Sequence, residues 1–512
     1  MQPIDLRQSV RRGIAHIRNS VDRQRDCRPY FRFNLKEPPV WAQHEGADTP
    51  HTVGRFLHAL DVCTETTGLP DDAELLKGLR TQLFASCERG DGFAWDDIGD
   101  PPLAYMHHQR EALLGLIALW HFDQDPHAKR YAGELVTAME QATRVSGTYP
   151  GRRLGPEGWQ EPDGRPTSTV GRAISALLSF TRTFDDPRGL ELAERFARRV
   201  LAVSFDEHGT LTVAAGAHIH SITGTVASLV ELGLVTGQRQ LIERARAIYD
   251  VGLLPYCTRT GWVKESANST YGRGEANCTA DLIEAACLLG SAGYYGYFED
   301  AERLLRNHLL ASQLDDLSWV VENEGLANAK QRAYEDLRHR ALGAFCFGEP
   351  NGFHSYNSDL TGAALQGIAA AWRHIVTLQN DGLLKVNLLL SREHEAVRIT
   401  SLLPRAGSVV IEAKRALDLH VRIPPWCPRQ SLAVTIDGHA ASIKVSEEYL
   451  AVGNVARDSQ VGVSFAQPEH VTQERALAYE QPYRVRWIGS TVAAMSGAGG
   501  PMALYPDLDP AE

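Results

Sequence analysis

The sequence predicts a mainly α protein with a β domain, an (α/α)6-type helical toroid followed by an antiparallel β-sandwich. Two observations lead to this prediction. In the first 310 residues, an apolar helix, a short turn and an amphipathic, charged helix recur five times, and after residue 380 the pattern changes to short alternating strands. Such a hairpin cannot bury its apolar face alone, so the copies must stack on one another.

The five hairpins place the apolar helix first, and their turns contain helix breakers or acids, as in Asp185-Asp186-Pro187. Irregular spacing and long insertions favour a closed ring over an open solenoid. A sixth inner helix is available at Thr361–Val376. The hairpins are predicted at Arg55–Phe84, Leu113–Met139, Ile174–Leu201, Thr225–Leu254 and Leu282–Leu310.

The helical period ends at the turn Asn380-Asp381-Gly382. Runs of four to eight residues separated by turn residues then follow at short intervals, which is typical of an antiparallel sandwich. We therefore assign residues 1–380 to a catalytic toroid and residues 381–512 to a β-sandwich domain. The predicted strands are Leu383–Leu390, Ala396–Leu402, Ser408–Ala413, Leu417–Ile423, Leu432–Ile436, Tyr449–Val452 and Gln460–Phe465.

The composition is that of an ordinary globular enzyme of 512 residues. The net charge of -11 disfavours a nucleic-acid partner, and no apolar stretch is long enough to span a bilayer. The eight cysteines are scattered without a CxxC pair, and the N-terminus lacks a secretory signal. We expect a cytoplasmic protein with neither nucleic-acid nor membrane partners; the oligomeric state, a homodimer included, is left open.

Polar clusters precede the apolar helices, where the loops of a toroid converge on a central funnel. The richest contains Glu265 and Glu275, two of the carboxyl groups that glycosidic bond cleavage requires. The alternative is that Glu275 or Asp281 caps a helix and that Glu265 is a solvated loop acid, with about even odds. A second cluster contains His354 and ends at Asp359, which an N-cap role would also explain.

Two further clusters contain His218 with His220, and His108. A histidine pair is more often structural than functional, but four clusters at equivalent helix ends favour a common site. We predict that His218 and His220 lie at the funnel and not in the core, with His220 facing in and His218 facing out, because residues two apart diverge on a helix. Aromatic rings that suit the apolar faces of sugars accompany the clusters: Trp41, Trp95, Trp159, Trp262, Tyr271 and Tyr356.

With these motifs the chain resembles the β-L-arabinofuranosidase family of glycoside hydrolases, family 127. The resemblance extends over most of the chain and implies a helical toroid followed by a β-sandwich. The matching stretches include Gly274–Asp281, Asp300–His308, Asp381–Ser391, His218–Ser221 and Val421–Trp426.

The resemblance also implies a zinc ion held by one glutamate and three cysteines, one of which is the nucleophile. Glu275 matches the glutamate, whereas Asn277, Asp359 and Leu360 stand where the cysteines are expected, and Cys278 is one residue out of register. Glu265 matches the family's acid/base glutamate. Because a thiolate site cannot form without its sulfurs, we predict no zinc held by cysteine.

Three hypotheses remain. In the first, Asp359 replaces the nucleophilic cysteine and Glu265 remains the acid/base. In the second, Glu275, Asn277 and Asp359 hold a hard cation such as calcium. In the third, the chain only binds sugar, or performs lyase or isomerase chemistry with His220 or Tyr271.

The first hypothesis is preferred: a glycoside hydrolase, without a cofactor, acting on a short oligosaccharide or glycoside such as an arabinofuranoside. We expect Asp359 to be ionised and Glu265 to hold a proton, its pKa being raised by burial or by the charge of Glu275. The expected substrate-binding residues are His220, His218, His108, Tyr271, Trp262, Asn277, His354 and Tyr356.

Overall fold

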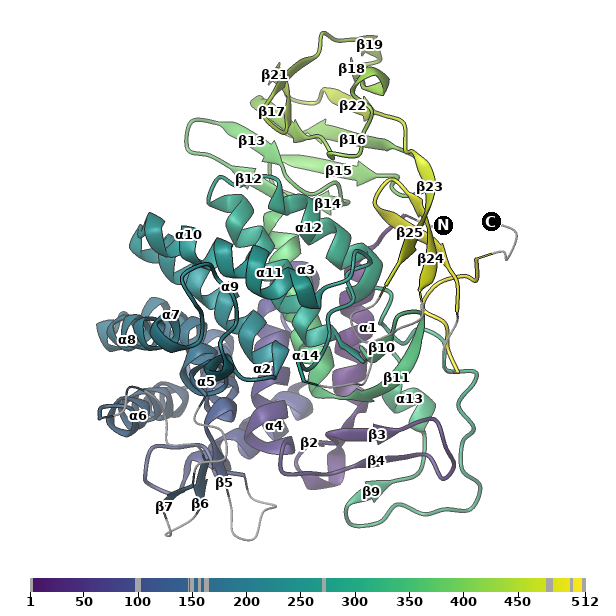
Figure 1. The fold of residues 1–512 in the computed structure, drawn as a ribbon. Helices are drawn as coiled ribbons and strands as arrows, with labels where there is room; N and C mark the ends of the chain where they lie inside the picture. The colour runs from purple at the N-terminus through teal and green to yellow at the C-terminus, as the bar shows by residue number, and fades with distance from the viewer. Residues whose placement is uncertain are drawn as a thin grey trace.

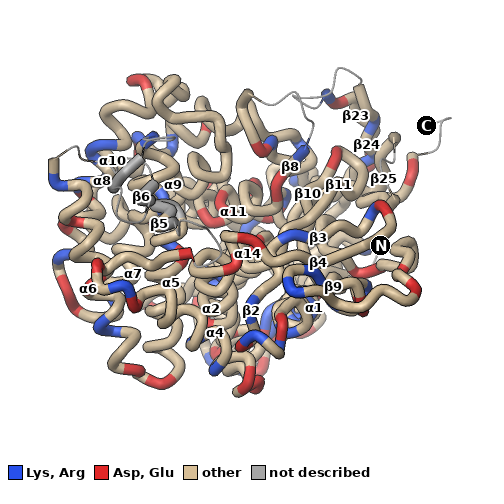
Figure 2. The backbone as a smooth tube through the Cα atoms, turned by 90° about the horizontal axis from the view of Figure 1, so that it is seen from below, with Lys and Arg blue, Asp and Glu red and all other residues tan. Residues whose placement is uncertain are grey.

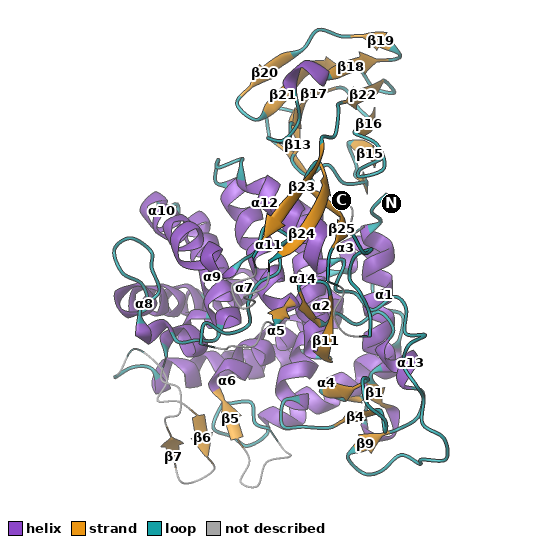
Figure 3. Cartoon of the chain, turned by 45° about the vertical axis from the view of Figure 1, so that its right-hand side comes forward, coloured by secondary structure: helices purple, strands orange, loops and turns teal. Residues whose placement is uncertain are grey.

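The architecture is a toroid of helices with a β-sandwich at one side (Figure 1). It is seen in a computed structural model that describes residues 3–96, 103–145, 147, 152–154, 158–160, 165–268, 273–475, 482–497 and 501–508. Helices form the body, and the strands of the sandwich lie at one end (Figure 3). The predicted fold class is confirmed.

Inner helices form a closed ring, in which each packs against the next and the last returns to the first. Each also packs against an outer helix, and the outer partner of the last inner helix is α1 (Leu6–Asn19). The inner helices are α2 (Val53–Val62), α5 (Met106–Asp123), α7 (Ala173–Phe184), α9 (Ile219–Thr236), α11 (Ala276–Ser291) and α14 (Asp359–His374). The other outer helices are α4 (Ala73–Cys87), α6 (Pro126–Ala142), α8 (Pro187–Val203), α10 (Arg239–Ala247) and α12 (Tyr297–Leu304).

Acids in the hairpin turns start several outer helices. Asp125 and Asp186 are the N-caps of α6 and α8, where their carboxylates accept hydrogen bonds from backbone N–H groups at 2.9 and 3.1 Å. A proline follows each cap and supplies the preset φ of a first helical residue. Asp72 caps α4 in the same way at 2.9 Å. The turn acids therefore fix where the outer helices begin.

The chemistry of the helix surfaces agrees with this arrangement. Basic and acidic residues are interspersed over outer helices such as α6 and α8, without a face of one sign (Figure 2). Among the described helices only α9 is long and apolar enough to cross a membrane, and 72% of that stretch is buried inside the protein. Its apolar character is that of an inner helix.

Two sheets form the sandwich, and every strand pair within them is antiparallel except β13 with β17. Their apolar core is continuous with that of the toroid. One sheet contains β12 (Val376–Leu378), β13 (Leu383–Val386), β17 (Leu417–Arg422), β21 (Tyr449–Val455) and β20 (Lys444–Ser446). The other contains β14 (Arg392–Glu393), β15 (Val397–Ser401), β16 (Ser408–Ala413), β22 (Gln460–Ser464), β18 (Ala433–Ile436) and β19 (His439–Ala440).

A buried ion cluster joins the sandwich to the toroid. Arg422 of β17 forms ion pairs with Glu299, at 2.9 Å, and with Glu302, both on α12. Trp426 donates its indole N–H to Glu299 at 3.0 Å. Arg422 is 2% exposed and Glu302 0% exposed, so the charges of this junction are screened from water.

A third sheet lies against the toroid. It contains β23 (Glu469–Glu474), β24 (Tyr483–Ile488) and β25 (Thr491–Met495). Arg306 and Asn307 hydrogen-bond to Ser490, and Asn351 donates to the carbonyl of Met495 at 3.0 Å. The end of the chain thus returns to the helical body.

A fourth sheet, which the sequence pattern did not predict, brings the starts of two inner helices together. It is antiparallel and has the order β8 (Gly274–Glu275), β10 (Phe347–Glu349), β11 (Gly352–Asn357), β3 (Arg32–Asn34), β4 (Trp41–Gln43) and β9 (Arg332–Ala333). Strand β8 leads directly into α11, and β11 leads into α14. Glu275 and Asp359 therefore lie at the same end of the toroid.

Candidate active site

Polar side chains from all six inner helices, or from the residue just before them, meet near their N-terminal ends. We call this set the charge ring. Each member is at most 7% exposed, so the ring is a buried polar layer within an apolar toroid. Its members are Arg55 of α2, Glu111 of α5, Arg172 before α7, His220 of α9, Asp281 of α11 and Asp359 of α14.

Glu111 is the anionic centre of the ring. Arg110 donates to both of its carboxyl oxygens at 2.8 Å, and Arg55 and Arg172 donate to Oε1 at 3.2 and 3.1 Å. Burial alone would raise the pKa of Glu111, but the three guanidinium groups hold its pKa well below the usual range. Glu111 is therefore a fixed negative charge that keeps the arginines in place.

His220 is neutral and fully engaged. Its Nε2 accepts hydrogen bonds from Arg55 and Arg172 at 2.8 and 3.0 Å, so the ring proton lies on Nδ1. Nδ1 lies 2.8 Å from Oδ2 of Asp281. Burial, Arg172 and Arg55 together lower the pKa of His220 well below its ordinary value. His220 therefore positions the arginines and has no free ring nitrogen for a substrate.

Asp359 is an ionised carboxylate with one oxygen unused. Its Oδ2 accepts hydrogen bonds from His51 at 3.3 Å and from Arg55 at 3.4 Å. Burial alone would raise the pKa of Asp359, but the His51 bond and the Arg55 charge lower its pKa below the ordinary value. Oδ1 is buried and has no hydrogen-bond partner among the residues that the structure describes.

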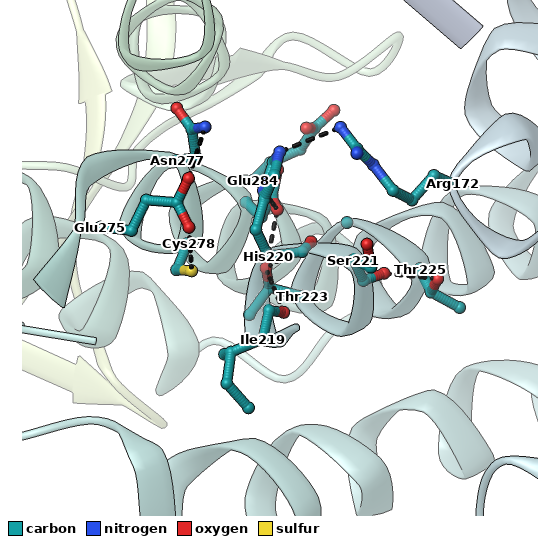
Figure 4. Close-up of polar contacts among 12 residues, drawn as sticks. Arg172, Ile219, His220, Ser221, Thr223, Thr225, Glu275, Asn277, Cys278 and Glu284 are labelled. Carbon is teal, nitrogen blue, oxygen red and sulfur yellow. Dashed lines mark hydrogen bonds and ion pairs between the residues drawn. The ribbon is translucent and has the colours of Figure 1, made fainter. Parts of the chain in front are cut away.

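Glu275 has the opposite character. It precedes α11 and is 5% exposed; Asn277 donates to its Oε1 at 2.9 Å, and Cys278 Sγ lies 3.6 Å from its Oε2 (Figure 4). Burial, followed by the charges of Glu265 and Asp359, raises the pKa of Glu275 to about 8. At neutral pH this carboxyl group holds a proton. Asn277 Oδ1 is buried and unpartnered among the described residues.

Glu265 lies nearer the surface, with its side chain 24% exposed. It forms a two-pronged ion pair with Arg273, whose guanidinium lies 4.1 Å above the ring of Phe347. Both carboxyl oxygens of Glu265 are engaged by this guanidinium, so the geometry does not support the expected role of Glu265 as the acid. Glu275 is the carboxyl group whose pKa is raised, and the charge of Glu265 contributes to that shift.

The histidines predicted by sequence lie around this centre. The ring of His108 is 4.6 Å from that of His51, the partner of Asp359. His218 accompanies His220 at a centroid distance of 5.8 Å, and its Nδ1 lies 2.8 Å from Ser221 Oγ. His354 is half-buried, with Nδ1 3.0 Å from Ser355 Oγ. His220 is buried and His218 is exposed, so the two side chains differ in accessibility although their rings are neighbours.

Two predicted sugar-stacking aromatics do not line the funnel. Trp262 is 1% exposed and donates its indole N–H to the carbonyl of Gly348 at 2.8 Å. Tyr356 is fully buried and stacks on Phe33, with centroids 4.5 Å apart. Tyr356 lies on β11, which sends alternate side chains into the core, and Trp262 packs against the same sheet at Gly274 of β8 and Gly348 of β10. Tyr271 lies outside the described residues.

The capping alternatives are not supported. Glu275 occupies the N-cap position of α11, but its side chain makes no capping hydrogen bond. Asp281 lies in the second turn of α11 and accepts hydrogen bonds from His220 and, at 2.7 Å, from Thr223. Ser358, not Asp359, is the N-cap of α14. None of the three carboxyl groups therefore serves to initiate a helix.

The chemistry of the side chains does not fit a zinc–thiolate centre. Beside Glu275 the sulfur ligand at hand is Cys278, whose pKa is raised well above its ordinary value by burial and by Glu275, so that it remains a thiol. Leu360 is a core residue. Within the described residues there is no group of three or more His, Cys, Asp or Glu arranged to hold a metal ion.

Sequence comparisons find no relative: no protein-family model matches the chain, and neither does any curated protein. Solved structures define the class of fold. A GH127 β-L-arabinofuranosidase from Geobacillus stearothermophilus T6 is 16% identical, with a TM-score of 0.58 over 86% of this chain and 76% of that one.

A second GH127 β-arabinofuranosidase is 13% identical, with a TM-score of 0.61 over 94% of this chain and 78% of that one. A further glycoside hydrolase is 14% identical, with a TM-score of 0.58 over 93% and 84% of the two chains. The resemblance predicted from the motifs is confirmed as a shared fold.

Proposed function

We propose that this protein is a glycoside hydrolase that cleaves a short oligosaccharide or glycoside with Asp359 and Glu275 as its carboxyl pair. Arabinofuranosides are the first substrate class to test, because the proteins of similar fold include arabinofuranosidases. The observation that supports the proposal most is the opposite protonation of the two groups: the pKa of Asp359 is lowered and that of Glu275 is raised to about 8.

Paired carboxyl groups with separated pKa values are what an acid and a base or nucleophile require. Glu275 is protonated at neutral pH and donates its proton to the leaving-group oxygen. Asp359 is ionised, and its unpartnered Oδ1 either attacks the sugar carbon or activates a water. Glu265, in its ion pair with Arg273, supplies the negative charge that helps Glu275 to keep its proton.

The buried acceptors also favour a sugar. Asp359 Oδ1 and Asn277 Oδ1 lack donors among the described residues, and an unsatisfied buried acceptor costs about 1–3 kcal/mol. Sugar hydroxyl groups would supply those donors. His354 and Glu265 are partly exposed, whereas Asp359 and Glu275 are buried. A substrate can therefore reach the buried carboxyl pair from the exposed side of the site.

The test is turnover of aryl glycosides, α- and β-furanosides and pyranosides, by purified variants. Glu275→Gln should lower kcat by about 10²–10⁴-fold, the typical contribution of general acid catalysis. Asp359→Asn should lower it by several orders of magnitude while sugar binding persists. Glu412→Gln, on a side chain of the sandwich that is 43% exposed, serves as the matched control with unchanged turnover.

The outcomes separate the rival functions. Near-normal turnover by Asp359→Asn would exclude its role as nucleophile or base. If sugars bind to the wild-type protein but no glycoside is cleaved, the chain is a sugar-binding relative. Rearrangement of a free sugar without hydrolysis would indicate isomerase chemistry, and an unsaturated product would indicate a lyase.

A hard cation is the second candidate for this centre, because Asn277 Oδ1 and Asp359 Oδ1 are unused oxygen ligands beside Glu275. The neighbouring Arg55 and the raised pKa of Glu275 oppose it, since both disfavour a further positive charge or an ionised ligand. Turnover that disappears with a chelator and returns with calcium would favour the cation.

A further inference from the structure

A cavity lies on the other side of the charge ring. It has a volume of about 540 Å³ and is lined by side chains of all six inner helices, mostly from their C-terminal halves. We call it the distal cavity. One polar lining residue from each inner helix defines it: His58, Arg110, Ser179, Glu231, Glu284 and Gln366.

These polar residues are unexpected on inner helices. A ring of packed helices is stabilised by apolar contacts, and burying polar groups costs free energy unless they are hydrogen-bonded. Glu231 is only 17% exposed, and Arg182 donates to its Oε1 at a long 3.4 Å. Gln366 donates to one oxygen of Glu284 at 3.2 Å. Each bond leaves the second carboxyl oxygen for water or a ligand.

The lining carries charges of both signs. Arg110, Arg182 and Arg373 face Asp61, Glu231 and Glu284, so the cavity offers both donors and acceptors of hydrogen bonds. Burial and the charge of Glu284 raise the pKa of Glu231 to about 7, and burial and Asp281 raise that of Glu284. Near neutral pH the carboxyl group of Glu231 can therefore either donate or accept a hydrogen bond.

The size and lining exclude several ligand classes. The volume lies in the range of small-molecule sites, about 300–1,000 Å³. None of the described lining residues is Phe, Tyr or Trp, and the apolar part consists of aliphatic side chains such as Leu114 and Ile117. A flat aromatic ligand would find no Phe, Tyr or Trp side chain to stack on, and a strongly charged ligand of either sign would meet charges of its own sign.

We propose that the distal cavity binds a small, neutral, polyhydroxylated molecule of the size of a mono- or disaccharide. Vicinal hydroxyl groups both donate and accept hydrogen bonds, as the carboxyl and guanidinium groups of the lining require. The proposal does not depend on catalysis at Asp359 and Glu275, because no residue of that pair lines the distal cavity.

The test is calorimetric titration of the full chain with D-glucose, D-galactose, L-arabinose and cellobiose, with D-glucuronate and D-glucosamine as charged comparators. Ala370 lines the cavity and is 9% exposed, so Ala370→Phe fills the space without altering the polar groups. It should abolish one binding event per chain. Ala456→Phe, at an exposed turn of the sandwich, is the matched control and should retain every event.

A second variant guards against misfolding of the first. The double change Glu231→Gln and Glu284→Gln keeps the cavity volume and should weaken the same binding event at least about tenfold, as expected for lost bonds to charged groups. The proposal is overturned if Ala370→Phe retains all binding events, if the charged sugars bind as tightly as the neutral ones, or if no neutral sugar binds outside the funnel. Failure of hydrolysis alone would leave these results unchanged.

Discussion

At the scale of single residues, the neighbours of a side chain decide its protonation. Asp359 and Glu275 are both buried carboxyl groups, but Asp359 receives a guanidinium and an imidazole, whereas Glu275 faces two other acids. The same burial therefore leads to opposite charges. Reaction roles follow from these partners more directly than from residue type.

The raised pKa of Glu275 also has a cost in stability. The folded protein holds this proton up to about pH 8, whereas the unfolded chain loses it near the ordinary glutamate pKa of 4.5. The folded state therefore binds more protons between these values, and the free energy of unfolding falls as pH rises through that window. Glu275→Gln should remove this fall in the free energy of unfolding, because glutamine does not titrate.

We therefore expect Glu275→Gln to be inactive but more stable than the wild type at pH 8, by on the order of a few kcal/mol at about 1.4 kcal/mol per unit of pKa shift. At pH 4 the two proteins should be nearly equal. Urea denaturation at both pH values measures the difference. A stability difference that does not vary with pH would contradict the assigned protonation.

Arg55 is a positioning residue, since it contacts Asp359, Glu111 and His220 at once. Its charge lowers the pKa of Asp359, so Arg55→Gln should raise that pKa and shift the acidic limb of the pH–activity profile to higher pH. Arg55→Lys should shift it less, because the charge is retained. A purely structural role would lower activity at every pH without moving the limb.

At the scale of elements, the helices and strands were largely predictable. The predicted strand Ser408–Ala413 coincides with β16, and the hairpin turn at Asp185-Asp186-Pro187 separates α7 from α8. Periodicity and turn chemistry are local, so a single sequence contains them. The fourth sheet was missed because its two- to six-residue strands come from distant segments.

The candidate site was predictable only in part, for the same physical reason. Glu275, Asp359 and His220 stand out because they follow polar loops at helix starts. Arg55, Glu111 and Arg172 were missed as site residues. They lie far apart in the sequence, and only the packing of six helices into a ring brings their side chains together. The available signal was a charged residue within the first turns of an otherwise apolar helix.

The junction between α12 and β17 depends on Arg422. Replacing it with Ala would leave Glu302, which is 0% exposed, as an uncompensated buried charge. Arg422→Ala should lower the free energy of unfolding by about 3–5 kcal/mol. Thermal denaturation measures the loss, and Arg398→Ala, at a half-exposed ion pair on β15, is the control expected to cost at most about 1 kcal/mol. If both variants lose the same free energy of unfolding, the buried ion cluster contributes no more to stability than an exposed ion pair.

At the scale of the whole molecule, the first helix covers the outer side of the last inner helix. Helix α1 packs on α14, and Ser9 hydrogen-bonds to Gln313 at 2.7 Å across 304 residues. A protein lacking residues 1–19 should therefore leave the apolar face of α14 exposed and bind hydrophobic dyes. Dye fluorescence and circular dichroism check this, with removal of residues 509–512 as the control. A truncated chain that remains compact and binds no dye would show that α14 does not need α1 to cover its apolar face.

The packing of α1 on α14 has a consequence for synthesis on the ribosome. Helix α1 is made first, but its partner α14 emerges more than 300 residues later. At about 5–20 residues per second, the interval is roughly 15–60 s. During that time the apolar side of α1 has no permanent neighbour, so the nascent chain presents a ready target for chaperones until its last inner helix arrives.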